Sequence, residues 1–267
     1  MISYEGLTLA QTKLKQQAVK SPLHFARFEF KYLLPLQLRQ KIEQDLAFFL
    51  QYDPFVVDKE GHRYPVRSLY YDDPVYSAFY DKVDGLHSRS KFRLRTYSFD
   101  SKDQTPVFLE IKGRHNSLVY KHRTPLADDD AVDWNTLSGN RLTQTVISQA
   151  DNSAVRDQFE FDTLRKTLQP VALIDYMRRP YISKFDPSFR ITFDEELKVS
   201  QTQSLFPGAS GSAAKKILPG YTILEVKFRH HMPSWFHRVI QAHELQRISI
   251  SKICSGMEVL GLAIDEN

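Results

Sequence analysis

Basic side chains at every second position are the feature of this sequence best suited to chemistry. The segment 91–97, Lys-Phe-Arg-Leu-Arg-Thr-Tyr, alternates between charged and apolar residues, and this period of two predicts a β-strand with one cationic face. Lys91, Arg93 and Arg95 would then repeat about every 7 Å. Such a face is commonly the solvated side of an antiparallel strand. Like charges this close are, however, tolerated best when an anion such as a chain of phosphates lies between them.

Four more segments repeat the design with carboxylates included, and this repetition favours the phosphate interpretation. The side chains predicted on the charged faces are Arg27, Glu29 and Lys31; Glu110, Lys112 and Arg114; Arg190, Thr192 and Asp194; and Glu225, Lys227 and Arg229. If the strands form one curled sheet, these faces meet inside it. Arg offers a fork and Lys a point charge to phosphate, so together they suit a linear polyanion. The sequence therefore predicts a wet, mostly cationic channel.

The carboxylates Glu29, Glu110 and Glu225 have two roles open to them. They can pair with neighbouring Lys and Arg side chains, or they can hold Mg²⁺ or Mn²⁺, which favours oxygen ligands and bridges phosphate oxygens. Their positions beside cations favour ion pairing for Glu29 and Glu110. No His or Cys spacing typical of zinc is present.

Composition excludes several classes of protein. The chain has 267 residues, of which 42% are hydrophobic and 25% charged, as in soluble globular proteins. It has neither an apolar run of about 18 residues nor a secretory signal, so no transmembrane segment of its own is expected. One cysteine predicts a reducing, cytoplasmic location. A net charge of +4 and the absence of known motifs argue against a nucleic-acid partner.

The elements that must position these residues are strands and flanking helices. Strands are predicted at about 25–34, 64–71, 89–99, 107–114, 119–123, 170–182, 188–198 and 221–229, and helices after Pro35, Pro74 and Pro233, within 125–168, and at the end of the chain. Short turns around the strand 89–99 indicate an antiparallel meander. We expect a lead-in at 1–22, one domain at 23–267, a helical insertion at 125–168 and a mobile loop at 199–220. The acidic run 128–130 is interpreted as a solvated loop.

Taken together and in order, these segments resemble the VTC domain, the polyphosphate polymerase domain of the triphosphate tunnel metalloenzyme (CYTH-like) superfamily. The resemblance covers about residues 23–262 and rests on 27–31, Arg93-x-Arg95, 109–112, 190–194, 225–227 and Ser251-Lys252. It implies an α+β fold, an antiparallel β-barrel that forms a tunnel, with helices packed on the outside. It also implies metal-dependent transfer of the ATP γ-phosphate onto a growing polyphosphate chain.

Roles for individual residues follow from the same resemblance. The implied catalytic residues are Lys31, Arg93, Arg95, Lys112, Arg179, Arg190 and Lys252, and further phosphate-binding residues are Lys91, Arg114, Lys121, Lys227 and Ser251. Arg114 stands where related sequences often place a His. The implied metal ligand for Mn²⁺ or Mg²⁺ is Glu225, with Glu29 and Glu110 as further candidates.

One departure from the pattern bears on the reaction. Many hydrolytic relatives open with Glu-x-Glu-x-Lys, whereas the first position here is Arg27, which favours holding a polyanion over hydrolysing a triphosphate. The leading hypothesis is a polymerase that uses ATP or another nucleoside triphosphate. A tripolyphosphate or nucleoside-triphosphate hydrolase and a non-catalytic module that binds inorganic polyphosphate or triphosphate are the alternatives. The membrane-spanning segments of eukaryotic relatives are absent, which leaves a membrane-associated partner open.

Overall fold

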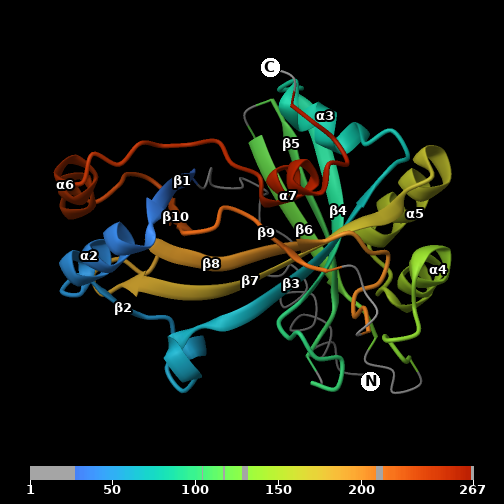
Figure 1. The fold of residues 1–267 in the computed structure, drawn as a ribbon, viewed down its shortest axis with the longest axis horizontal. Helices are drawn as coiled ribbons and strands as arrows, with labels where there is room; N and C mark the ends of the chain where they lie inside the picture. The colour runs from blue at the N-terminus through green and yellow to red at the C-terminus, as the bar shows by residue number, and fades with distance from the viewer. Residues whose placement is uncertain (1–27, 104, 117, 128–131, 209–212, 266–267) are drawn as a thin grey trace, which may run out of the picture.

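The computed structural model describes residues 28–103, 105–116, 118–127, 132–208 and 213–265, without the side chains of Leu118 and Val119. Its centre is a ten-stranded antiparallel sheet with the strand order β1-β10-β8-β7-β3-β4-β5-β6, in which β2 also pairs with β7 and β9 with β8 (Figure 1). The strands are β1 (Phe28–Pro35), β2 (Leu50–Tyr52), β3 (Tyr64–Asp72), β4 (Ser88–Thr96), β5 (Phe108–His115), β6 (Leu118–Pro125), β7 (Gln169–Ser183), β8 (Arg190–Ser200), β9 (Lys215–Lys216) and β10 (Tyr221–Phe228). The predicted α+β class and antiparallel sheet are confirmed.

The helices begin close to the residues that the sequence indicates. They are α2 (Leu36–Leu46), α3 (Ser77–Val83), α4 (Gly139–Gln149), α5 (Ala154–Lys166), α6 (Ser234–Ala242) and α7 (Lys252–Leu260), with short 3-10 turns η1 (Pro54–Val56) and η2 (Glu60–His62). The start of α3 is held by two carboxylates. Asp72 accepts the Ala78 N–H at 2.9 Å and Asp73 accepts the Ser77 N–H at 2.9 Å, which satisfies amides that have no partner inside the helix.

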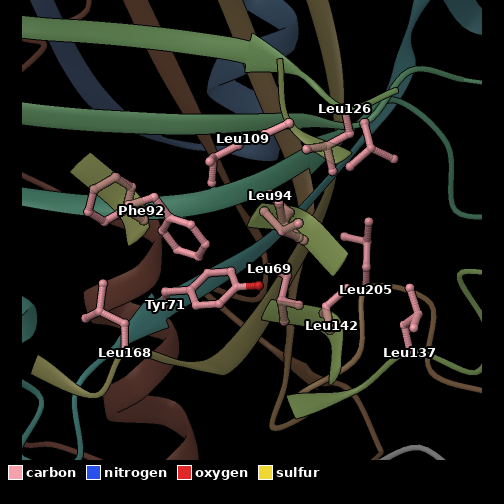
Figure 2. Close-up of a cluster of buried hydrophobic side chains, with 14 of the residues drawn as sticks. Leu69, Tyr71, Phe92, Leu94, Leu109, Leu126, Leu137, Leu142, Leu168 and Leu205 are labelled. Carbon is pink, nitrogen blue, oxygen red and sulfur yellow. The ribbon is translucent and has the colours of Figure 1, made fainter. Parts of the chain in front are cut away.

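One face of the sheet is apolar and carries most of the helices. Figure 1 shows α4 and α5 at one end of the molecule and α2 and α6 at the other. Figure 2 shows Leu69, Phe92 and Leu94 of the sheet gathered with Leu142 of α4. At the other end, α2 and α6 bury a second cluster that includes Ile42, Phe236, Phe189, Ile191 and Phe193. These side chains alternate along the strands with charged ones, so the packing of the apolar face fixes the direction of the charged face.

The last helix corrects the expectation that all helices pack on the outside. Ile253 and Met257 of α7 pack with Tyr70 and Tyr176, and both tyrosines lie on the charged face, where their hydroxyls accept hydrogen bonds from Arg93 and Arg95. A Cβ on Gly256 would lie 2.7 Å from Cδ1 of Ile174, so glycine is needed for this close approach. α7 therefore lies over the charged face and brings its first turn to the cations of the sheet.

The segment predicted as a mobile loop at 199–220 holds more structure than expected. β8 runs to Ser200, β9 pairs with β8, and Leu205 and Phe206 are buried in the core. The insertion at 125–168 contains α4 and α5. The predicted lead-in at 1–22 and the acidic run 128–130 lie outside the described residues. None of the described helices has the length and apolar character needed to cross a membrane.

Candidate functional site

The charged face joins strands that are far apart in the sheet. In the register of the sheet, Lys31 of β1 lies opposite Glu225 of β10, and Arg93 of β4 lies opposite Glu110 of β5. Lys112 Nζ on β5 approaches Glu29 Oε1 on β1 to 3.5 Å, although five strands lie between β1 and β5 in the strand order. The sheet is therefore curled, with charged side chains from its two ends facing each other.

A first group of charges surrounds Glu225, and we call it the Glu225 cluster. Lys252 Nζ lies 2.7 Å from Glu225 and 2.6 Å from Asp194, and Lys227 Nζ lies 3.0 Å from Glu225. Arg178 donates to both oxygens of Asp194 at 2.6 and 2.7 Å. Burial alone would raise the pKa of Glu225, but Lys252, Lys227 and Arg178 hold that pKa well below its usual range. Both carboxylates are therefore ionised, and they fix the cations in place.

A second group, the Glu110 cluster, forms on β4, β5 and β6. Arg93 donates two hydrogen bonds to Glu110 Oε2 at 2.8 and 2.6 Å, and Lys121 Nζ lies 2.7 Å from Oε1. Arg93 also donates to the Tyr70 hydroxyl at 2.8 Å, and Arg95 lies 4.0 Å from Glu110. Burial opposes ionisation of Glu110, yet Arg93, Arg95 and Lys121 lower its pKa to about 2. One carboxylate thus faces three cations, which leaves positive charge for a ligand.

Three lysines occupy the space between the two clusters. Glu29 Oε1 lies 3.3 Å from Lys31 Nζ and 3.5 Å from Lys112 Nζ. Lys91 donates to the Ser251 hydroxyl at 3.4 Å, which ties β4 to the start of α7. Although burial would raise it, the pKa of Glu29 falls to about 2, chiefly because of Lys112. The cationic surface therefore continues from one cluster to the other.

Most of the predicted site residues lie on this face, and one does not. Those on the charged face are Lys31, Lys91, Arg93, Arg95, Lys112, Arg114, Lys121, Arg190, Lys227, Ser251 and Lys252, with Arg114, Lys121 and Arg190 exposed. Arg179 is the correction, because its guanidinium donates to Glu43 of α2 at 3.0 Å on the opposite face. Its neighbour Arg178 occupies the site instead. Successive residues of a strand point to opposite faces, so only one of the two arginines can reach it.

Sequence reasoning also missed residues that hold the arginines in position. Arg95 donates to Ser68 Oγ at 2.9 Å and to the Tyr176 hydroxyl at 3.4 Å, and Tyr70 holds Arg93 as described. β3 and β7 carry apolar residues on both faces, so their alternation does not reveal which side faces the charges. Within β7, the two neighbours Leu173 and Ile174 are both buried.

The carboxylates differ in how well they fit a metal ion. Mg²⁺ and Mn²⁺ suit sites with one or two carboxylates completed by substrate phosphates. Glu29 and Glu225 are electrostatic neighbours and fit this role. Glu110 fits less well, because its side chain is 0% exposed, whereas those of Glu29 and Glu225 are 30% and 8% exposed. Across the described residues, no group of three or more His, Cys, Asp or Glu side chains is arranged to hold a metal.

Comparison with known proteins gives one match over most of the chain. The family model described as the VTC domain matches residues 26–261. No curated protein matches. Two solved structures are similar over nearly their whole length: the PH1819 protein from Pyrococcus horikoshii OT3 (12% identity, TM-score 0.44, covering 88% of this chain and 98% of that one) and the mimivirus capping enzyme triphosphatase (7% identity, TM-score 0.32, covering 92% and 99%).

Proposed function

The chain belongs to the VTC domain family, and on this premise we propose that it transfers the γ-phosphate of ATP onto a polyphosphate chain held along the charged face. The proposal includes closure of the curled sheet into a β-barrel tunnel around that chain. One observation carries it: cations from β1, β4, β5, β6, β7, β10 and α7 converge on one surface. Desolvated cations are costly unless they are compensated, and a linear polyanion would compensate all of them.

The residues of the site suit phosphoryl transfer. The transition state is stabilised mainly by alignment and by neutralisation of charge, so no nucleophilic side chain is required. Arg93 and Arg178 are fixed by two hydrogen bonds each to a buried carboxylate, and arginine groups held in this way need little reordering when a phosphate arrives. We infer that they orient the phosphates of donor and acceptor.

A metal ion would add to this charge. A bound Mn²⁺ or Mg²⁺ ion would supply further positive charge against the phosphate oxygens. Glu225 and Glu29 are the residues that would hold it. We infer that Lys31, Lys112 and Lys252, which pair with these carboxylates, also contact the phosphates. The single cysteine supports a cytoplasmic location as part of this proposal.

Incubation with ATP and Mn²⁺ tests the reaction. Gel ladders of long phosphate chains are the expected product. Release of orthophosphate alone would replace the polymerase by the hydrolase alternative. Tight polyphosphate binding without turnover would favour the binding module, an alternative that the cation pairing of every site carboxylate supports.

Two neighbouring arginines supply a matched pair of variants. Arg178→Ala removes a guanidinium from the charged face, and Arg179→Ala removes one from the opposite face. We expect chain synthesis to fall at least tenfold in the first, since a lost charge-assisted contact costs about 1.5–3 kcal/mol, and to persist in the second. Circular dichroism checks that both variants fold. Equal loss in both, with the fold intact, would contradict the assignment of the site.

A further inference from the structure

Beyond the two clusters, the charged face leads to a separate cavity. Its volume is about 320 Å³, and its polar lining is Lys82 of α3, His87, Arg89 of β4, Arg114 of β5 and Ser249. Arg89 lies four residues before Arg93 and six before Arg95 on the same strand, about 13 and 20 Å away at 3.3 Å per residue. The cavity is therefore an extension of the cationic row beyond the Glu110 cluster.

The charges of this cavity lack the carboxylates found elsewhere on the charged face. Arg89 and Arg114 lie directly opposite each other in the register of β4 and β5, an arrangement that is destabilising for like charges. Burial and the neighbouring Arg114 lower the pKa of Arg89, and Asp81 of α3 only partly opposes them. Among the described residues, no carboxylate lies within 4.0 Å of the charged nitrogens of Lys82, Arg89 or Arg114. By contrast, Arg93, four residues further along β4, donates two hydrogen bonds to Glu110.

The three cations are nevertheless held in place. Arg89 donates to the Leu86 carbonyl at 2.5 Å, Arg114 donates to the Asn116 carbonyl at 2.7 Å, and Lys82 donates to Ser249 Oγ at 3.4 Å. Each guanidinium has five N–H donors, so these bonds leave others for a ligand. Ser249 lies two residues before Ser251, whose hydroxyl accepts a hydrogen bond from Lys91 Nζ. The same segment thus borders both the cavity and the middle of the charged face.

We propose that this cavity is a distal phosphate site, which binds the part of a polyphosphate chain that extends beyond the Glu110 cluster. The site makes affinity depend on chain length, because a triphosphate held at Arg93 and Arg95 is too short to reach Arg89. This inference rests on the proposed function and adds to it a site that makes binding depend on the length of the polyphosphate chain. Arg89, Lys82 and Ser249 are assigned to phosphate binding by this geometry alone.

Calorimetric titration with two probes, triphosphate and long-chain polyphosphate, tests the site. The variant Lys82→Ala/Arg89→Ala is compared with the wild-type protein and with Arg165→Ala/Arg238→Ala, which removes two exposed guanidiniums on α5 and α6. We expect the first variant to bind long-chain polyphosphate about tenfold more weakly or worse, as lost charge-assisted contacts require, and triphosphate as before. Its long-chain affinity should also depend less steeply on salt, since fewer counterions are released.

The outcomes separate this inference from the proposed function. Equal affinity of the wild type and the first variant for the long chain would overturn the distal site and leave the proposed function intact. An equal loss for both probes would also overturn it, because the cations would then act on the whole surface without regard to length. If the wild type bound neither probe, the proposed function would fail, and the distal site with it. Arg89→Ala alone is a second variant with the same expected preference.

Discussion

Replacing Glu110 with Gln tests whether this carboxylate organises the phosphate site or only supports the fold. Glu110 is fully buried and is the anionic partner of Arg93, Arg95 and Lys121. The Glu110→Gln variant keeps the shape of the side chain and removes its charge. Three cations would then face one another without an internal counter-charge.

The expected loss of stability follows from the pKa of Glu110. Interactions in the folded state lower this pKa from 4.5 to about 2, which corresponds to about 3 kcal/mol of unfolding free energy. For a domain of this size, that loss lowers Tm by roughly 6–12 °C. Because the folded pKa lies below the unfolded one, the contribution is present above pH 4.5 and is lost as the pH falls towards 2. The difference between wild type and variant should therefore shrink in acid.

A polyanion should reverse the loss. If phosphates bind between Arg93 and Lys121, they replace the missing negative charge, and triphosphate should raise Tm more in the variant than in the wild type. Thermal denaturation with and without triphosphate, at constant ionic strength, measures both effects. A variant as stable as the wild type, or one that triphosphate does not rescue, would refute the reasoning.

Glu43→Gln is the matched control. Glu43 also bridges arginines, Arg39 and Arg179, but on the opposite face of the sheet. We expect this variant to lose stability and to gain no extra rescue from triphosphate. Rescue of both variants to the same degree would show that triphosphate acts on net charge, without binding at the Glu110 cluster.

Three further predictions concern single residues. Burial, together with Arg93 and Arg95, lowers the pKa of Lys121 to about 8; since only the protonated form attracts phosphate, triphosphate affinity should fall as the pH rises from 7 to 9, and Lys121→Arg should flatten that profile in binding titrations. Asp72→Ala, which removes the acceptor for three backbone N–H groups, should lower the unfolding free energy by about 1–2 kcal/mol in urea denaturation; no change would contradict the capping role. Glu225→Gln should abolish turnover with ATP and Mn²⁺ while polyphosphate still binds, and full activity would exclude Glu225 as a metal ligand.

The sequence was informative wherever one face of a strand is charged and the other apolar. In β4, Phe92 and Leu94 enter the apolar core and Arg93 and Arg95 enter the site, as the alternation predicts. In β7, Leu173 and Ile174 are both buried, so the sequence pattern does not show which side of the strand faces the charges. The choice between Arg178 and Arg179 therefore could not be made correctly.

Other features depend on contacts distant in sequence. The partners Lys112 and Glu29 are brought together only by the curl of the sheet, which no local pattern encodes. The position of α7 on the charged face likewise depends on the fit of Gly256 against Ile174. From the sequence alone, a glycine within an apolar helix does not indicate which residue will pack against it.

The most direct test of the central claim is a crystal structure of the protein with bound triphosphate. We predict phosphate oxygens within hydrogen-bond distance of Arg93, Arg178 and Lys252, on the charged face and beneath α7. Triphosphate bound on the opposite face beside Arg179, or only at scattered surface lysines, would contradict the claim that these side chains form one phosphate-binding surface.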